Sequence, residues 1–394
     1  MKYVEFYTLV SDDSDNEGNE GSDEDEEQDN LPNVDGSGDA KHFQWTNPDI
    51  NYRPANLTAF RRQPPNGVLI NTNGYEIVDY FDQLFVPQVY KVISDETNRY
   101  AQFFLDGPTP LKRKSRFHHW KATSADEIQS YIALEIAMTM CQKPSLEEYW
   151  SSWFLNQTPN FRSVMSCERF CMIRSFFHFA NNDEQVANGE EGYDALFKIR
   201  QLLDLMDPKL LSCYAPDKNL SFDESMLKFK GRWSFKQYCP QKPTKWGIKE
   251  YDLADGKTGY ILKHLPYHGK NTTVPEGNRL VTEQLVLDMV EGFEKKGHVL
   301  YLDRFFTSPR LAKELRDKGI GMCGTIKKNR VGMPQDLKVL KLQKGSEPVF
   351  RKCTSGGILV CQWMDTKQVS MISTVHTNEV IDKQVIHLTR LVLV

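Results

Sequence analysis

The chain has 394 residues, 40% of them hydrophobic, which is enough to build the cores of two or more ordinary domains. No apolar run approaches the ~18 residues of a membrane span, and no N-terminal segment joins a basic flank to an apolar core, so we expect a soluble, intracellular protein and no membrane partner. The formal charge of −4 is unevenly spread: residues 1–40 contain one lysine and fourteen acidic residues, and the remainder has 48 basic and 39 acidic residues.

The acidic segment predicts that residues 1–41 form a disordered tail. Such a tail is either simply solvated or shields a nucleic-acid surface of the same molecule until DNA displaces it. Residues 42–74 are rich in Pro, Asn and Arg without a sustained period, which is typical of a linker or an extended arm.

Residues 75–215 space their apolar side chains at three- and four-residue steps, which predicts a helical domain. The predicted helices cover 76–103 with an interruption near Pro87, the segment after the capping-box pattern of Ser124 and Glu127, 166–179, and 193–206, where Pro208 stops the helix.

After Pro216 the pattern changes to short β-branched and aromatic runs separated by Gly and Pro. Three strands, a helix, a strand, a helix and a strand are predicted at 220–222, 247–253, 260–265, 281–296, 299–302, 308–318 and 321–326. This order predicts an α/β fold of the RNase H-like type. A further hairpin is predicted from strands at 357–364 and 369–375.

Two aspartates, Asp223 and Asp303, follow predicted strands of this α/β segment. Carboxylates at the ends of adjacent strands can share Mg²⁺ or Mn²⁺, because these hard ions prefer oxygen ligands and leave positions open for water and phosphate. An aspartate at a strand end is also a common turn or capping residue, so the catalytic and the structural interpretations both stay open.

The segment between these aspartates is basic and aromatic. Cations paired with exposed rings are expected along a nucleic-acid groove, whereas a plain β-hairpin would turn its rings inward and leave its lysines in water. Both interpretations can hold together. Five aromatic residues interleave with the candidate DNA-binding residues Lys228, Lys230, Arg232, Lys236, Lys242, Lys245 and Lys249.

Ordered motifs over residues 75–378 resemble the piggyBac transposase family. They include Trp120-Lys121-Ala122-Thr123, Ser221-Phe222-Asp223-Glu224, Lys230-Gly231-Arg232, Lys242-Pro243-Thr244-Lys245-Trp246-Gly247-Ile248-Lys249 and Leu302-Asp303-Arg304-Phe305-Phe306-Thr307-Ser308. The resemblance implies a dimerisation and DNA-binding domain at 75–215, an RNase H-like catalytic core at 216–329, and a β-rich insertion with an unmatched tail at 330–394. It also implies that Asp223 and Asp303 are catalytic metal ligands for Mg²⁺ or Mn²⁺, with DNA and a second transposase subunit as partners, in the nucleus.

The family's third acidic ligand, in a Gly-Gly-Val-Asp-like segment, has no counterpart here, so we expect an incomplete, C-terminally truncated DDE core. Asp365 and Asp382 are the nearest acidic candidates, and each also fits an ordinary hairpin or loop. Three functions stay open: a DNA-binding relic without catalysis, an active metal-dependent transposase or nuclease at TTAA sites, and a nuclear interaction module that dimerises.

Overall fold

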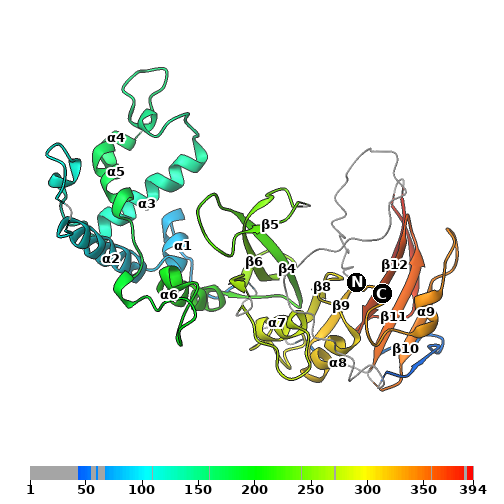
Figure 1. Ribbon diagram of the computed structural model, residues 1–394. Helices are drawn as coiled ribbons and strands as arrows, with labels where there is room; N and C mark the ends of the chain where they lie inside the picture. Colours follow the sequence, from blue (N-terminus) through cyan, green and yellow to red (C-terminus); the bar gives the residue numbers. More distant parts are fainter. Residues whose placement is uncertain are drawn as a thin grey trace. The chain divides into compact units, whose positions relative to one another are not determined.

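The computed structural model describes residues 43–54, 59–60, 67–108, 110–158, 160–240, 242–269, 272–355, 357–385 and 388–393, with side chains up to residue 380. Two compact units are present, one within residues 65–215 and one that joins the described residues before 65 to those from 216 onward (Figure 1). The predicted acidic tail lies outside the described residues.

Helices dominate the first unit: α1 (Ile77–Leu84), α2 (Pro87–Leu105), α3 (Ala125–Met140), α4 (Phe161–Val164), α5 (Cys167–Phe176) and α6 (Phe197–Cys213). The predicted interruption at Pro87 is confirmed, because Pro87 opens α2 at a position where a backbone donor is not needed. The Ser124 hydroxyl accepts a hydrogen bond from the Glu127 amide and begins α3 as predicted. These helices bury one cluster that includes Ile93, Ile128 and Phe170.

The predicted end of the last helix at Pro208 is wrong. Pro208 lies inside α6, which continues to Cys213, although a proline removes one backbone donor of the helix. Contacts beyond the helix compensate: the Leu69 amide donates to the Cys213 carbonyl at 2.8 Å, and β2 (Gly67–Val68) pairs with β3 (Tyr214–Ala215) directly after α6. The end of α6 is therefore set by this pairing, a contact between segments far apart in the sequence.

The second unit is built on one ten-stranded sheet in the order β1-β10-β11-β12-β9-β8-β4-β6-β5, with β7 also paired to β6. Its strands are β1 (Trp45–Thr46), β4 (Asn219–Lys228), β5 (Gln237–Tyr238), β6 (Trp246–Asp255), β7 (Ile261–Pro266), β8 (Val299–Leu302), β9 (Gly321–Thr325), β10 (Val349–Cys353), β11 (Ile358–Met364) and β12 (Gln368–Ser373). The helices α7 (Val281–Met289), α8 (Pro309–Asp317) and α9 (Gln335–Val339) lie between them in sequence, and β13 (Val380–Val385) pairs with β14 (Leu388–Leu393) apart from the sheet.

The centre of the sheet has the predicted order of strands and helices. Strands β4, β8 and β9 run parallel, and β6 pairs antiparallel to β4. The helix predicted over 281–296 ends earlier, at Met289, because Gly292 adopts a positive φ of 90° that a continuing helix does not allow. The mixed α/β architecture of the prediction is thus present in this unit.

Segments predicted to lie outside the core extend its sheet. Strand β12 pairs antiparallel with β9, so β10, β11 and β12 continue the central sheet (Figure 1). The predicted arm at 42–74 contributes β1 to the sheet edge, where the Trp45 indole donates to the Gly332 carbonyl at 2.9 Å. Within the described part of the chain, no helix has both the length and the hydropathy to cross a bilayer.

Candidate carboxylate site and nucleic-acid interface

Asp223 and Asp303 lie on neighbouring strands. The parallel register of β4 and β8 pairs Phe222 with Leu302. Asp223 is the next residue of β4, and Asp303 comes directly after the last residue of β8. Phe222 and Leu302 are buried, whereas both aspartates are exposed, as expected when successive side chains point to opposite faces. The predicted adjacency of the two strands is confirmed. Asp223 itself lies within β4, which continues to Lys228, and it marks the point where pairing with β8 stops.

The surroundings of Asp223 favour the protonated form of its carboxyl group. Its pKa is raised, first by loss of hydration and further by the negative charges of Asp303 and Asp252, while the Glu224 amide and Lys242 oppose the shift. Asp252 is directly opposite Asp223 in the antiparallel pair of β4 and β6. The sequence interpretation missed Asp252, although the two-residue alternation of β6 indicates its face.

Hydrogen bonds from its own loop and from β9 orient Asp303. The Thr325 hydroxyl, at the end of β9, donates to Asp303 Oδ1 at 3.1 Å. The Asp303 carbonyl accepts from the amides of Phe306 and Thr307 at 3.2 and 3.3 Å, which forms a tight turn directly after the carboxylate. Within the described part of the chain, only one of the two carboxylate oxygens of Asp303 accepts a hydrogen bond.

The carboxylates of Asp223 and Asp303 are the type of ligand that a hard divalent ion prefers, but two ligands are few for such an ion. Two adjacent carboxylates offer only oxygen, which suits Mg²⁺ or Mn²⁺, and their mutual repulsion would be relieved by a cation. No group of three or more His, Cys, Asp or Glu able to hold a metal occurs among the described residues. Asp365 lies in the turn between β11 and β12, where its amide donates to the Lys367 carbonyl, and the side chain of Asp382 is outside the described part.

A groove of about 590 Å³ lies along the basic segment that follows β4. Among the described residues, its lining contains no Asp or Glu and consists of Lys228, Phe229, Lys230, Lys236, Pro243, Thr244, Lys245 and Trp246. The Trp246 side chain is 54% exposed, packs on Tyr238 with ring centroids 4.7 Å apart, and has the Lys236 ammonium 5.6 Å from its ring. Cations and an exposed ring are therefore presented together.

A narrow three-strand arrangement supports this groove. Gly247 of β6 is paired with Lys228 of β4 on one side and with Gln237 of β5 on the other. A Cβ at Gly247 would lie 2.2 Å from the Leu227 carbonyl oxygen, so glycine permits the close approach of β4 and β6. The segment is thus a hairpin with exposed lysines, as the alternative interpretation expects, but Tyr238 and Trp246 are about half exposed on it rather than turned inward.

Three of the seven candidate DNA-binding residues do not line the groove. Arg232 is exposed in the turn that follows β4. Lys242 is directed to Glu224, with its ammonium 3.3 Å from the carbonyl and 3.5 Å from the carboxylate. Lys249 is buried, its ammonium 5.3 and 5.6 Å from the rings of Tyr251 and Phe305, so it does not belong to the exposed basic surface.

Comparison with known proteins places this geometry in a family. The profile of the family described as transposase IS4 matches residues 77–390. The human PiggyBac transposable element-derived protein 2 is 25% identical over 342 residues, covering 84% of this chain and 53% of the relative, and the human PiggyBac transposable element-derived protein 3 is 26% identical over 340 residues with the same coverage. The chain therefore spans about half the length of these curated relatives.

A solved structure has the same fold. The cryo-EM structure of a piggyBac transposase synaptic complex with hairpin DNA superimposes with a TM-score of 0.67 at 22% identity, covering 78% of this chain and 63% of that one. The mixed α/β sheet of the second unit agrees with this match. The chain belongs to the transposase IS4 family, among the piggyBac transposase-derived proteins.

Proposed function

We propose that this chain is a DNA-binding protein that holds the DNA backbone in the groove of Lys228, Lys230, Lys236 and Lys245. The observation that carries the proposal is the lining of that groove, where four lysines and no Asp or Glu occur among the described lining residues. Each lysine that neutralises a phosphate releases a condensed counterion, which favours binding to any DNA sequence. The similar transposase was solved in a complex with hairpin DNA, which supports DNA as the ligand.

Trp246 adds a second kind of contact to the same groove. Its ring is about half exposed, and its contacts with Tyr238 and Lys236 hold it in place. A base that leaves its stack can lie on such a ring, and one base on one ring contributes roughly 1–3 kcal/mol. The groove therefore suits single-stranded or distorted DNA better than a regular duplex, which keeps its bases stacked.

The proposal includes the carboxylates of Asp223 and Asp303, because the basic segment begins on the strand that carries Asp223. Asp223 and Lys228 are five residues apart on β4, about 17 Å along an extended strand. Lys242, from the loop after β5, contacts Glu224 and lowers the pKa of Asp223. We propose that Asp223 and Asp303 hold Mg²⁺ or Mn²⁺ there, which would supply a Lewis acid next to a bound phosphate. A protein that binds chromosomal DNA acts in the nucleus, and we propose that location and self-association for this chain.

A second candidate function is metal-dependent cutting and joining of DNA at TTAA sites. The observation in its favour is the exposed pair of carboxylates on adjacent parallel strands, on which a phosphoryl-transfer site can be built. DNA binding is the first candidate, because no group of three or more His, Cys, Asp or Glu that could hold a metal occurs among the described residues.

The binding proposal is tested by fluorescence anisotropy with hairpin, single-stranded and duplex DNA at 50–300 mM salt, taken as roughly the range in which phosphate contacts dominate. We expect affinity to fall steeply with salt and Trp246→Ala to weaken single-strand binding by about 1–3 kcal/mol. Trp363→Ala is the matched control, because Trp363 is a partly exposed tryptophan on β11 in the same unit and does not line the groove. An affinity that does not depend on salt, or equal losses in the two variants, would refute the proposed interface.

A further inference from the structure

Arg330 contacts the segment that follows Asp303. It lies on the loop after β9, and its guanidinium donates to three carbonyls of that segment. Nε donates to Thr307 O at 3.0 Å, and one terminal nitrogen donates to Phe305 O at 2.6 Å and to Arg304 O at 3.0 Å. A planar guanidinium with five donors can hold several carbonyls at once, which an ammonium group on a flexible chain cannot reproduce.

These bonds close a ring of contacts around Asp303. Thr325, five residues before Arg330, donates through its hydroxyl to the Asp303 carboxylate and accepts through its carbonyl from the Thr307 hydroxyl. The Asp303 carbonyl accepts from the Phe306 and Thr307 amides. The carboxylate, the turn after it and the end of β9 are therefore linked, and Arg330 joins that turn to the loop beyond β9.

The other end of the segment is anchored in a buried polar network. The Ser308 hydroxyl accepts from the Leu311 amide at 3.0 Å at the start of α8 and donates to the carboxylate of Glu283, which is 3% exposed. Glu283 also accepts from the Leu280 amide at 3.3 Å and lies 3.9 Å from the Arg310 guanidinium.

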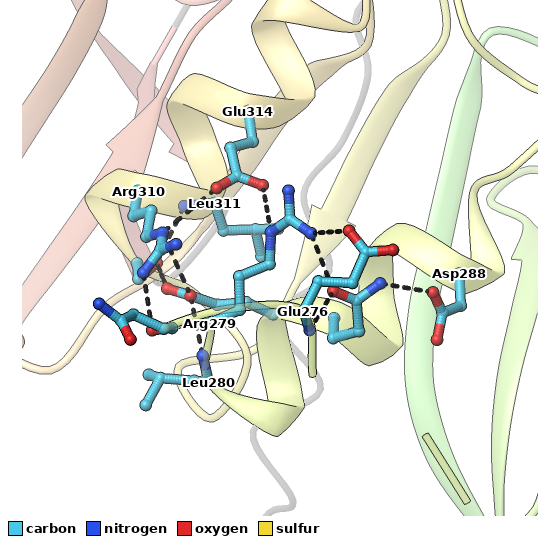
Figure 2. Close-up of polar contacts among 11 residues, drawn as sticks. Glu276, Arg279, Leu280, Asp288, Arg310, Leu311 and Glu314 are labelled. Atoms are coloured by element: carbon cyan, nitrogen blue, oxygen red, sulfur yellow. Dashed lines mark hydrogen bonds and ion pairs between the residues drawn. The ribbon is translucent and has the colours of Figure 1, made fainter. Parts of the chain in front are cut away.

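Figure 2 shows how this network extends between the two helices. Arg310 and Arg279 both reach Glu314 of α8, at 3.2 and 3.0 Å, and Arg279 also contacts Glu276 at 2.7 Å (Figure 2). The start of α8 is therefore fixed to α7 and the loop before it. Residues 304–307 connect this anchor to Asp303, and three of their carbonyls are the ones that Arg330 holds.

We infer that Arg330 is a positioning residue, which fixes the segment after Asp303 and so sets where the second carboxylate meets a metal ion shared with Asp223. This inference rests on the proposed metal site. Electrostatics and geometry predict opposite effects of removing Arg330. Loss of a nearby positive charge strengthens the binding of a dication by itself, whereas a misplaced carboxylate weakens it.

The test measures Mn²⁺ binding to the full chain without DNA, by electron paramagnetic resonance of free Mn²⁺. Loss of a residue that orients a metal ligand costs 10–100-fold in affinity, so we expect Arg330→Met to weaken Mn²⁺ binding by about tenfold or more. Arg316→Met is the matched control. Arg316 also donates to backbone carbonyls, those of Gly357 and Thr374, and these lie outside the Asp303 segment. We expect the control to leave Mn²⁺ affinity unchanged.

Amide hydrogen exchange of residues 304–307 is measured on the same variants and should become faster in Arg330→Met and stay unchanged in Arg316→Met. Arg330→Lys keeps the charge and most of the volume, so it preserves the test if the methionine variant does not fold, and it should also lower Mn²⁺ affinity. Unchanged or stronger Mn²⁺ binding in the Arg330 variants would overturn the inference. A wild-type chain whose Mn²⁺ binding does not depend on Asp223 and Asp303 would instead overturn the proposed metal site, and this inference with it.

Discussion

Replacing three groove lysines, Lys228, Lys230 and Lys245, with glutamine should reduce DNA binding by a calculable amount. All three side chains are exposed, line the groove and lose one positive charge each while keeping most of their length. For duplex DNA each phosphate contact contributes about 0.9 to the slope of log affinity against log salt. Three contacts then lower the slope by about 2.7, which at 0.1 M salt corresponds to roughly 3–4 kcal/mol, or several hundred-fold in affinity.

The assay is a titration of labelled DNA at five salt concentrations, with a control that removes the same charge elsewhere. Lys313, Lys341 and Lys344 are exposed in the same unit and lie outside the groove, so their triple glutamine variant has the same net charge. We expect the slope of log affinity against log salt for the control to equal that of the wild type to within about 0.9, the contribution of one phosphate contact. Equal slopes for the two triple variants would refute the groove as the binding surface, since only total charge would then matter.

Two further predictions concern stability. Gly247→Ala should destabilise the unit by at least about 2 kcal/mol in urea unfolding, because the added carbon meets the Leu227 carbonyl at 2.2 Å and forces β4 from β6. Burial, with the charge of Lys218 as a second cause, lowers the pKa of His376 to about 4 from 6.5. The unfolded chain then binds the proton more readily than the folded chain does. The stability that neutral His376 contributes is therefore complete above pH 6.5 and is lost as the pH falls toward 4. This stability amounts to on the order of 3 kcal/mol. His376→Gln should flatten the pH dependence of the unfolding free energy across that window. His118→Gln, at an exposed position, should leave that dependence unchanged.

Local sequence rules predict local structure well in this chain. Ser124 caps its helix through the hydroxyl as predicted, and Ser166 and Ser308, at the starts of two other predicted helices, do the same. Strand β8 has the predicted bounds because its run of apolar residues is short and fully enclosed. Failures appear where distant segments decide the outcome, as at Pro208, where pairing of β2 with β3 determines how far α6 continues.

Some residues of the candidate site could be predicted from the sequence, and others could not. The family motifs identify Asp223 and Asp303, and the register of β4 and β8 brings them together. The basic composition of its segment predicts an exposed Lys249, but strict alternation along β6 places it on the face of Tyr251 and Leu253, which is buried. Arg330 carries no local signal, because its partners precede it by 23 to 26 residues and become neighbours only when the β8 and β9 strands pair.

The last prediction concerns catalysis by the 394-residue chain. Asp223 and Asp303 alone would neutralise at most two of the four positive charges of a two-metal site, so a second ion would be held weakly and the phosphate would be poorly placed. We therefore expect DNA binding without Mg²⁺- or Mn²⁺-dependent hairpin formation or strand joining on TTAA-flanked ends, measured on denaturing gels with labelled DNA. Metal-dependent joining that disappears in Asp303→Ala would contradict this reasoning. The missing ligand would then have to come from Asp252, from Asp382 or from a second subunit, and Asp252→Asn would separate the first of these from the others.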